Sequence, residues 1–134
     1  IKGEKDPIDK SADIVLVSYY GAVSKYIGYF KHVFIGKSML KKFQNNGGQN
    51  PIDAAKMGCK IFHGPYVYNF QDIYKFLNES GFSKETKNTE DLAKKLIEKF
   101  QITSKIDDQK IEEINTYSNK IFNNVITEYN KFIK

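Results

Sequence analysis

Residues 51–64, Pro-Ile-Asp-Ala-Ala-Lys-Met-Gly-Cys-Lys-Ile-Phe-His-Gly, place a short helical segment directly before a buried strand. Pro51 suits the first turn of a helix, because its ring presets the helical φ angle and no N–H is needed there. Gly58 supplies a helix stop. The segment at 59–62 is predicted to form a buried strand. A helix that leads straight into a buried strand predicts a parallel α/β sheet.

The same alternation extends to both sides of this stretch. Strands are predicted at 13–18, 32–36, 59–62 and 82–85, and helices at 22–30, 51–57, 70–79 and 89–100. Short connections between such elements favour right-handed crossovers within one sheet. We therefore expect a Rossmann-like parallel half-domain of the α/β class, in which ligands bind beyond the carboxyl ends of the strands.

The end of the chain has a different character. Residues 107–134 are predicted to form one long amphipathic helix, because apolar side chains such as Ile114, Ile121 and Val125 recur at helical spacing. This helix either closes the domain by packing on the sheet or docks on a membrane or a partner domain. We expect it to leave the sheet core, and uncovered apolar residues would then drive self-association. The predicted organisation is a polar lead-in at 1–12, an α/β domain at 13–101 and the helix at 102–134.

Composition bounds the function. The chain has 134 residues, 40% of them hydrophobic, which fits one domain or a piece of a longer protein and excludes a disordered tail. The apolar runs are too short for a signal peptide or a membrane-spanning helix. The single cysteine excludes an internal disulfide and a cysteine-based zinc site. The net charge is +5 and every basic residue is Lys, which weakens a nucleic-acid interpretation but suits an anionic substrate or membrane.

The strongest candidate site is the run Gly47-Gly48-Gln49-Asn50 ahead of the helix that carries Asp53. Glycines before a helix expose backbone amides that bind anions, and an acidic residue one turn later is able to accept hydrogen bonds from ribose hydroxyls. The alternative is purely structural, because Gly-Gly before Asn-Pro also makes a good turn and helix cap.

Four further features have weaker chemical meaning. His63 follows a strand and is either an acid or base or a hydrogen-bonded structural residue, since no carboxylate is positioned to orient it. The Tyr20-Gly21 turn admits a ligand close to the backbone but is equally a tight turn. A lysine cluster at 37–42 suits phosphate or solvent. Cys59 is expected to be an inert buried thiol.

Four motifs, in order, resemble those of bacterial 3-deoxy-D-manno-octulosonic acid (Kdo) transferases. Ile-Val-Leu-Val-Ser-Tyr-Tyr-Gly (14–21) resembles their strand ending in Asp-Thr-Met-Gly-Glu, and Phe-Ile-Gly-Lys-Ser (34–38) looks like Phe-Val-Gly-Gly-Ser. Gly-Gly-Gln-Asn-Pro-Ile-Asp-Ala-Ala (47–55) is similar to Gly-Gly-His-Asn-Pro-Leu-Glu-Pro-Ala. Gly-Pro-Tyr with Asn-Phe (64–70) matches Gly-Pro-His and Asn-Phe.

The resemblance implies the carboxyl-terminal, donor-binding half of a GT-B glycosyltransferase that moves Kdo from CMP-Kdo to a lipid A precursor in lipopolysaccharide biosynthesis. It implies a full-length protein at the cytoplasmic face of the inner membrane, peripheral or anchored, with no nucleic-acid partner, and a soluble fragment. The motifs and the local chemistry together assign donor contacts to Tyr20, Gly21, Ala22, Gly47, Gly48, Gln49, Asn50 and Asp53. Candidate contacts to the donor sugar or its phosphate are Ser38, Gly64, Pro65, Tyr66 and Asn69.

The motifs also depart from the family pattern. Ala22 replaces the acid of Met-Gly-Glu, Asp53 shortens the second acid, and Lys37 stands for the second glycine of Gly-Gly-Ser. The resemblance implies no cofactor, no metal and no catalytic residue in this fragment, because the family's general base lies in the amino-terminal domain; we therefore expect the fragment to be inactive. Two alternatives stay open: another nucleotide-sugar transferase or epimerase, and a non-catalytic interaction domain of the same fold.

Overall fold

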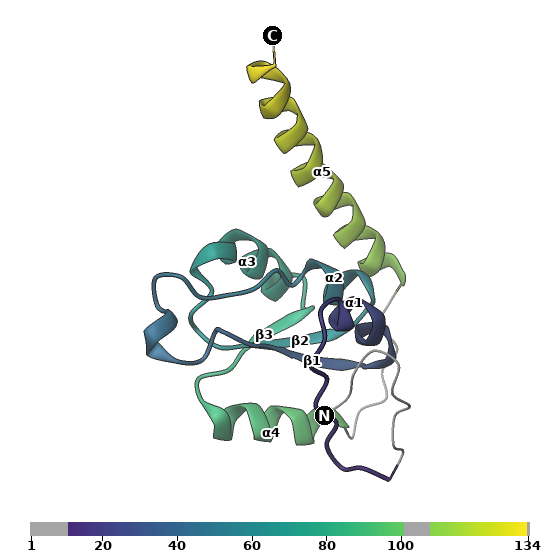
Figure 1. Ribbon diagram of the computed structural model, residues 1–134, viewed down its shortest axis with the longest axis vertical. Helices are drawn as coiled ribbons and strands as arrows, with labels where there is room; N and C mark the ends of the chain where they lie inside the picture. Colours follow the sequence, from purple (N-terminus) through teal and green to yellow (C-terminus); the bar gives the residue numbers. More distant parts are fainter. Residues whose placement is uncertain (1–10, 101–107, 134) are drawn as a thin grey trace.

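The computed structural model describes residues 11–100 and 108–133, and shows a three-stranded parallel sheet with helices around it (Figure 1). The strands are β1 (His32–Ile35), β2 (Lys60–His63) and β3 (Ser83–Glu85), hydrogen-bonded in the order β1-β2-β3. The α-helices are α1 (Ala22–Tyr26), α2 (Ile52–Lys56), α3 (Gln71–Glu79), α4 (Thr89–Phe100) and α5 (Asp108–Phe132), with short 3-10 turns η1 (Ile27–Tyr29), η2 (Lys41–Phe43) and η3 (Tyr68–Phe70). This architecture confirms the predicted Rossmann-like α/β class.

The central strand β2 is buried, as the sequence predicted, and the burial extends to both of its faces. It pairs with β1 so that Val33 faces Ile61, and with β3 so that Ile61 faces Ser83. Ile61 and Phe62 are both inaccessible to solvent, and successive strand side chains point to opposite faces of a sheet. The strand therefore contributes to apolar layers above and below itself.

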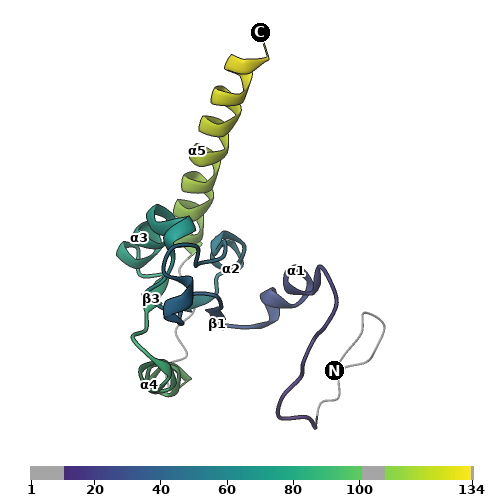
Figure 2. The same cartoon turned by 60° about the vertical axis from the view of Figure 1, so that its left-hand side comes forward.

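Helices cover the two faces of the sheet unequally (Figures 1 and 2). Both views place α2, α3 and the start of α5 on one side of the strands and α4 on the other. The main core lies on the α2 and α3 side, where Ile61 packs with Ala55, Tyr74 and Leu77. Cys59 belongs to this core, lies 3.1 Å from the Phe30 carbonyl oxygen, and has its thiol pKa raised by burial.

The prediction of a strand at 13–18 is wrong. Only an isolated bridge at Val17 is assigned there, and Ile14 and Leu16 are largely exposed. The β-branched run suits a strand locally, but β propensity reports packing and pairing with neighbours, and among residues 11–100 and 108–133 this segment joins no ladder. The other three predicted strands are present within one residue of their expected positions.

The first half of α5 packs on the body and the second half projects away from it (Figures 1 and 2). Ile114 is fully buried in the main core, and the Tyr117 ring stacks on Phe76 of α3 with centroids 3.9 Å apart. Val125 is 60% exposed. The prediction that this segment is helical is confirmed over its described length, whereas only its second half leaves the sheet core, because Ile114 in the first half belongs to that core. Across residues 11–100 and 108–133, none of the helices combines the length and apolar character needed to span a bilayer.

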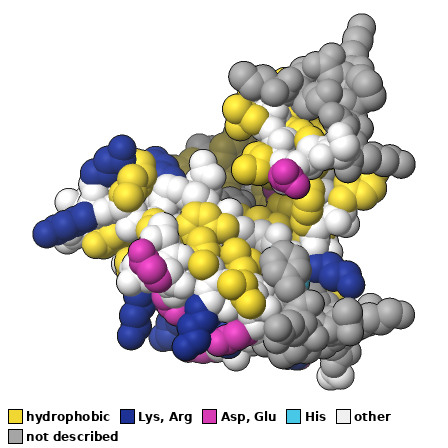
Figure 3. Space-filling model, turned by 90° about the horizontal axis from the view of Figure 1, so that it is seen from below, with side chains coloured by type: hydrophobic (Ala, Val, Ile, Leu, Met, Phe, Trp, Pro, Cys, Tyr) yellow, Lys and Arg dark blue, Asp and Glu magenta, His cyan; other side chains and the backbone are white. Residues whose placement is uncertain are grey.

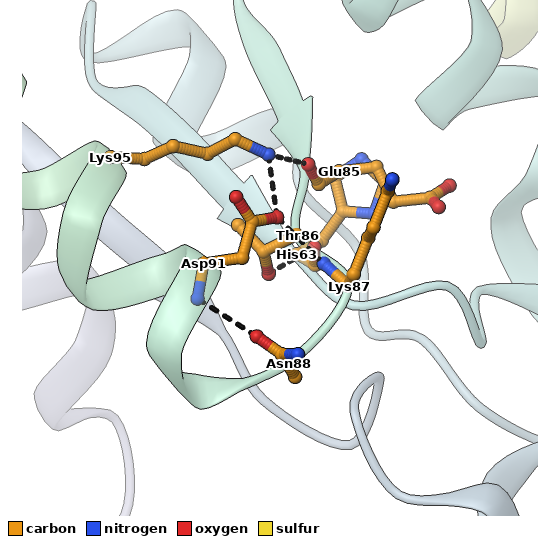
Figure 4. A network of polar contacts seen from close by, with 7 residues as sticks. All are labelled: His63, Glu85, Thr86, Lys87, Asn88, Asp91 and Lys95. Atoms are coloured by element: carbon orange, nitrogen blue, oxygen red, sulfur yellow. Dashed lines mark hydrogen bonds and ion pairs between the residues drawn. The ribbon is translucent and has the colours of Figure 1, made fainter.

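The ends of β2 and β3 are tied to the start of α4 by a polar network (Figure 4). The backbone amide and hydroxyl of Thr86 both donate to the His63 carbonyl, at 2.7 and 2.9 Å. Asn88 caps α4 by accepting the Asp91 amide at 2.8 Å. The Asp91 carboxylate accepts the Lys95 ammonium at 2.8 Å and the Lys87 amide at 2.9 Å. These bonds fix the position of α4 below the sheet.

The Asp91 contacts predict an acid-sensitive contribution to stability. The Lys95 ammonium, with help from the Lys87 amide, lowers the pKa of Asp91 below its ordinary value. A depressed carboxyl pKa stabilises the fold above the unfolded pKa, near 3.9, and this contribution is lost as pH falls through the folded value. The difference in unfolding free energy between wild type and Asp91→Asn, measured by urea titration, should therefore shrink from pH 7 to pH 3.

The matched control is Glu90→Gln, one residue earlier in the same turn, whose carboxylate accepts a hydrogen bond from Thr89 rather than from a lysine. The difference in unfolding free energy between Glu90→Gln and wild type should stay nearly constant over the same pH series. A difference for Asp91→Asn that is equal at pH 7 and pH 3 would contradict the assigned network.

Candidate functional site

Two loops meet at the carboxyl edge of the sheet, residues 36–50 after β1 and residues 64–70 after β2. Three backbone hydrogen bonds hold them in shape: Gly48 N–H to Lys37 O at 2.8 Å, Tyr66 N–H to Ser38 O at 2.8 Å, and Asn69 N–H to Gly47 O at 3.1 Å. The loops that carry three of the four resembling motifs are therefore one bonded unit. This is the edge at which open parallel sheets bind ligands.

The buried Ser38 side chain links the two loops through hydrogen bonds. Its hydroxyl donates to the Ile35 carbonyl at 2.7 Å and accepts the Gly64 amide at 2.9 Å, and the residue is completely buried. The hydroxyl therefore joins the end of β1 to the end of β2. Ser38 supports the edge of the sheet rather than offering its side chain at the surface.

The motif glycines allow the loops to approach closely. A Cβ on Gly64 would overlap the Ser38 backbone, and one on Gly47 would lie 2.5 Å from the Phe43 carbonyl oxygen. Gly48 has a φ of +85°, and its Cβ would lie 2.9 Å from the Val67 Cα. Glycine is required here because backbone passes directly over backbone. All three glycines are buried.

This packing changes the role expected of the glycine pair. The Gly48 amide donates to Lys37, so an anion would reach it only by displacing that bond. Asn50 accepts the Ile52 amide at 3.0 Å through its Oδ1 and so caps α2, as the structural alternative proposed. Gln49 is exposed, and its carbonyl accepts the Tyr74 hydroxyl at 2.9 Å. Asp53 is exposed in the first turn of α2.

The remaining residues of the second loop are more open. Pro65 and Asn69 are exposed and Tyr66 is half-buried. The Asn69 side-chain amide donates to the Asn46 carbonyl at 3.0 Å, which adds a further tie between the loops. Together with Asn50 and Asp53, these residues give the carboxyl edge a polar, accessible rim.

Lysines line the outer side of the first loop. Lys37 and Lys42 lie over the ring of Phe43, with their ammonium groups 6.0 and 5.1 Å from its centroid. Lys37, Lys41 and Lys42 are all exposed. Figure 3 shows dark blue lysine side chains at the left of the face seen from below, the side on which η2 lies in Figure 1. This positive rim suits an anionic ligand at the adjacent edge.

Lys37 also has an unusual backbone. Its φ is +57°, the left-handed region that side chains with a Cβ rarely adopt. It stands where the resembling family has the second glycine of Gly-Gly-Ser. A glycine adopts this conformation with little strain, which gives a physical reason for a glycine at the matching position of the motif, and in this chain a lysine adopts it.

The Tyr20-Gly21-Ala22 turn is not brought to this edge. Figure 2 shows α1 displaced beyond the β1 side of the sheet, apart from α2. Gly21 has a φ of +80° at the start of α1, Tyr20 is fully exposed, and Ala22 is buried. The turn is therefore a helix entry, and the expectation that it faces the start of α2 is not met.

His63 has a structural setting. It is buried at the end of β2, its Nδ1 lies 2.8 Å from the Gly64 carbonyl and its Nε2 lies 3.3 Å from Asn78 Oδ1. Its ring packs against Tyr74 with centroids 4.4 Å apart. Both ring nitrogens are thus engaged inside the protein, which supports the structural interpretation over acid–base chemistry. Within residues 11–100 and 108–133, no three His, Cys, Asp or Glu side chains are grouped to hold a metal ion.

Sequence reasoning missed the interlocking of the loops. Ser38 and Gly64 are predicted as candidate ligand contacts and Tyr74 is not singled out by the sequence, whereas each of the three makes a hydrogen bond that shapes the carboxyl edge. The signal was partly available: two glycine motifs that follow neighbouring parallel strands must end at the same edge. Spacing alone does not say which of their backbones cross.

Comparison with known proteins identifies a relative. The chain is 30% identical over 101 residues to the 3-deoxy-D-manno-octulosonic acid transferase of Aquifex aeolicus (strain VF5). The match covers 75% of this chain and 27% of that protein, so the matched region spans about a quarter of the relative's length. No family model matches the chain. The curated match confirms the resemblance to Kdo transferases that the four motifs indicated.

The close approach at Gly64 predicts a large cost for the smallest substitution. Gly64→Ala places a methyl group against the Ser38 backbone, and overpacking of this kind typically costs 1–3 kcal/mol, so we expect a loss of about 3 kcal/mol of unfolding free energy. Urea denaturation followed by circular dichroism measures it. The control is Gly28→Ala, where the added Cβ meets only Met57 Sδ at 3.7 Å. Equal losses for the two variants would contradict the assigned packing.

The positive φ angle of Lys37 predicts that glycine at this position stabilises the fold. Lys37→Gly relieves about 1–2 kcal/mol of backbone strain and adds about 0.4–1 kcal/mol of unfolded-state entropy cost. We therefore expect a net gain near 0.5–1 kcal/mol in thermal or urea unfolding. Lys41→Gly, in the same loop but without a positive φ, should lower stability instead. A loss of stability for Lys37→Gly would show that the side chain matters more than the strain.

Proposed function

We propose that this chain is the nucleotide-sugar-binding part of a Kdo-transferase-like glycosyltransferase of the GT-B type, with CMP-Kdo as donor. The observation that carries the proposal is the location of three family-like motifs on two interlocked loops at the carboxyl edge of β1 and β2, together with the similarity to the Aquifex enzyme. The order of the motifs along the chain and their position at one edge of the sheet are two separate observations that support the same function.

The exposed rim of this edge has the chemistry that a nucleotide requires. Asp53 is exposed on the first turn of α2 and is proposed to accept ribose hydroxyls. Asn50 uses its Oδ1 to cap the helix, which leaves its NH₂ group to donate to the phosphate or base. The lysines at 37, 41 and 42 supply positive charge beside it.

In the proposed reaction a sugar hydroxyl of the acceptor attacks the anomeric carbon of the donor, and CMP leaves. The contribution of this chain is to hold the nucleotide and to offset the negative charge that grows on the leaving phosphate, for which lysines are suited. The acceptor, a lipid A precursor, and any membrane contact are proposed to involve parts of the longer protein. The chain by itself is proposed to be inactive.

Three features favour a second function. The Ser38 hydroxyl and the Gly48 amide are committed to internal bonds, and Ala22 lacks the acid of the family motif. These features suit a domain that keeps the fold and uses it for interaction without catalysis. Such a domain would not bind CMP.

The binding prediction is tested with amide chemical-shift mapping. CMP at millimolar concentration should perturb the amides of Gln49, Asn50 and Asp53. A charge-assisted hydrogen bond contributes about 1.5–3 kcal/mol, so Asp53→Ala should weaken CMP binding roughly tenfold or more. Asp72→Ala, which removes an exposed acid from the first turn of α3, should leave binding unchanged.

Other outcomes separate the alternatives. Shifts in this loop with UDP but not with CMP would assign the edge to a different nucleotide sugar. No shifts with either nucleotide would support the interaction domain. Equal weakening in the Asp53 and Asp72 variants would show that the loss of affinity does not come from a direct contact with the Asp53 carboxylate.

A further inference from the structure

Lys37 has a backbone conformation that disfavours a side chain. With a φ of +57°, it is the one residue other than glycine that has a positive φ within residues 11–100 and 108–133. A residue with a Cβ is strained in this region, whereas glycine is not. Strained residues of this kind cluster at ligand sites, where the side chain serves a purpose other than folding. The lysine at this position is therefore not explained by the preference of the backbone.

Few contacts within the protein offset this strain. The Lys37 side chain is exposed, and its ammonium lies 6.0 Å from the centroid of the Phe43 ring. That distance is the outer limit of a cation–π contact, and such contacts are weak at exposed positions. Among the described residues, the ammonium has no hydrogen-bond or ion-pair partner. The side chain is thus available to a group from outside the chain.

The backbone holds this side chain at the carboxyl edge of the sheet. The Lys37 carbonyl accepts the Gly48 amide at 2.8 Å. The next residue, Ser38, is buried and bonded to the end of β1 and to the residue that follows β2. Gly48 comes two residues before Asn50, which caps α2. The Lys37 side chain therefore starts from a fixed point beside the polar rim that carries Asn50 and Asp53.

The loop around Lys37 is positively charged and contains no counter-charge. Residues 36–50 include three lysines and no acidic residue. The Lys42 ammonium lies 5.1 Å from the same Phe43 centroid, so two cations are gathered around one ring. Like charges held together raise the local positive potential and attract anions. A phosphate monoester carries between one and two negative charges at neutral pH and suits this place, whereas an uncharged nucleoside gains nothing from it.

We propose that Lys37 is a specificity-determining residue that selects phosphorylated ligands at the carboxyl edge. Its ammonium binds the phosphate group, and Lys42 adds charge beside it. The inference rests on the proposed function, in which this phosphate is that of the nucleotide, and it adds the residue that separates a nucleotide from a nucleoside. The side chain that strains the fold is thereby the one that contacts the ligand.

The affinities of the 134-residue chain for CMP and for cytidine test the proposal, measured by amide chemical-shift titration. Wild type should bind CMP at least about tenfold more tightly than cytidine, as expected for a hydrogen bond between charged groups. Lys37→Asn should reduce this preference to about twofold, because asparagine tolerates a positive φ and carries no charge. Its affinity for cytidine should stay that of wild type. Lys37→Arg should retain most of the preference, because the charge is kept.

The matched control is Lys41→Asn, which removes the same charge from the same loop. Lys41 is exposed and has no positive φ, and the two ammonium groups at the Phe43 ring are those of Lys37 and Lys42. The preference of Lys41→Asn for CMP should stay within about a factor of two of wild type, because a surface charge without direct contact is largely screened.

A second readout separates ligand binding from folding. Lys37→Gly removes the strain together with the charge. It should therefore unfold at a higher urea concentration than wild type and yet lose the preference for CMP over cytidine. A residue with a structural role alone would not shift stability and ligand preference in opposite directions.

Two results would overturn the proposal and leave the nucleotide site intact. The first is an equal preference for CMP in wild type and in Lys37→Asn. The second is an equal loss of preference in Lys37→Asn and Lys41→Asn, which would assign the effect to the overall charge of the loop.

A chain that binds neither CMP nor cytidine would be titrated with inorganic phosphate. Phosphate-dependent shifts of the amides at 37–43 that Lys37→Asn abolishes would support phosphate selection by Lys37 and contradict the proposed nucleotide function. The absence of such shifts in wild type would overturn both proposals.

Discussion

The bond from the Gly64 amide to the Ser38 hydroxyl is the contact around which the carboxyl edge is built. It places the backbone of the second loop directly against that of the first, and the absence of a Cβ at Gly64 makes the approach possible. From this crossing the other features follow: Tyr66 binds the Ser38 carbonyl, Asn69 binds that of Gly47, and Gly48 closes the first loop on Lys37. Loops built this way are rigid because they are packed backbone against backbone.

This constraint gives the family-like motifs a shared physical meaning. Residues in Gly-Gly-Asn-Pro or Gly-Pro patterns are easily taken for ligand contacts, since glycine permits a ligand to approach. In this chain the space that glycine leaves is filled by the protein itself. The rim residues Asn50 and Asp53 remain for chemistry, and the glycines hold them in place. A pattern shared with an enzyme family can thus reflect the scaffold of a site as much as its contacts.

Much of the fold could be predicted from local sequence, and the exceptions have physical causes. The apolar run of β2 and the helical periodicity of α5 identified their elements because burial and amphipathic spacing are encoded in a single segment. The strand predicted at 13–18 is absent, because strand formation depends on pairing with a neighbouring strand, which the segment's own sequence does not specify. The site was more difficult to predict from the sequence than the fold. The cap at Asn50 was anticipated because it is local, whereas the buried hydrogen bonds of Ser38 and the turn at Lys37 depend on which loops cross. Tyr20 and Gly21 were misplaced because the motif order does not fix the position of α1.

The setting of Cys59 has a practical consequence for studying this molecule. Its thiol is enclosed in the core, and burial raises its pKa, so little reactive thiolate reaches the solvent. We therefore expect the native cysteine not to react with maleimide or nitroxide labels. A cysteine introduced on the rim of the carboxyl edge or on the projecting helix would be modified selectively, without removal of the natural one. Distances across the molecule are accordingly open to spectroscopy on an otherwise unaltered sequence.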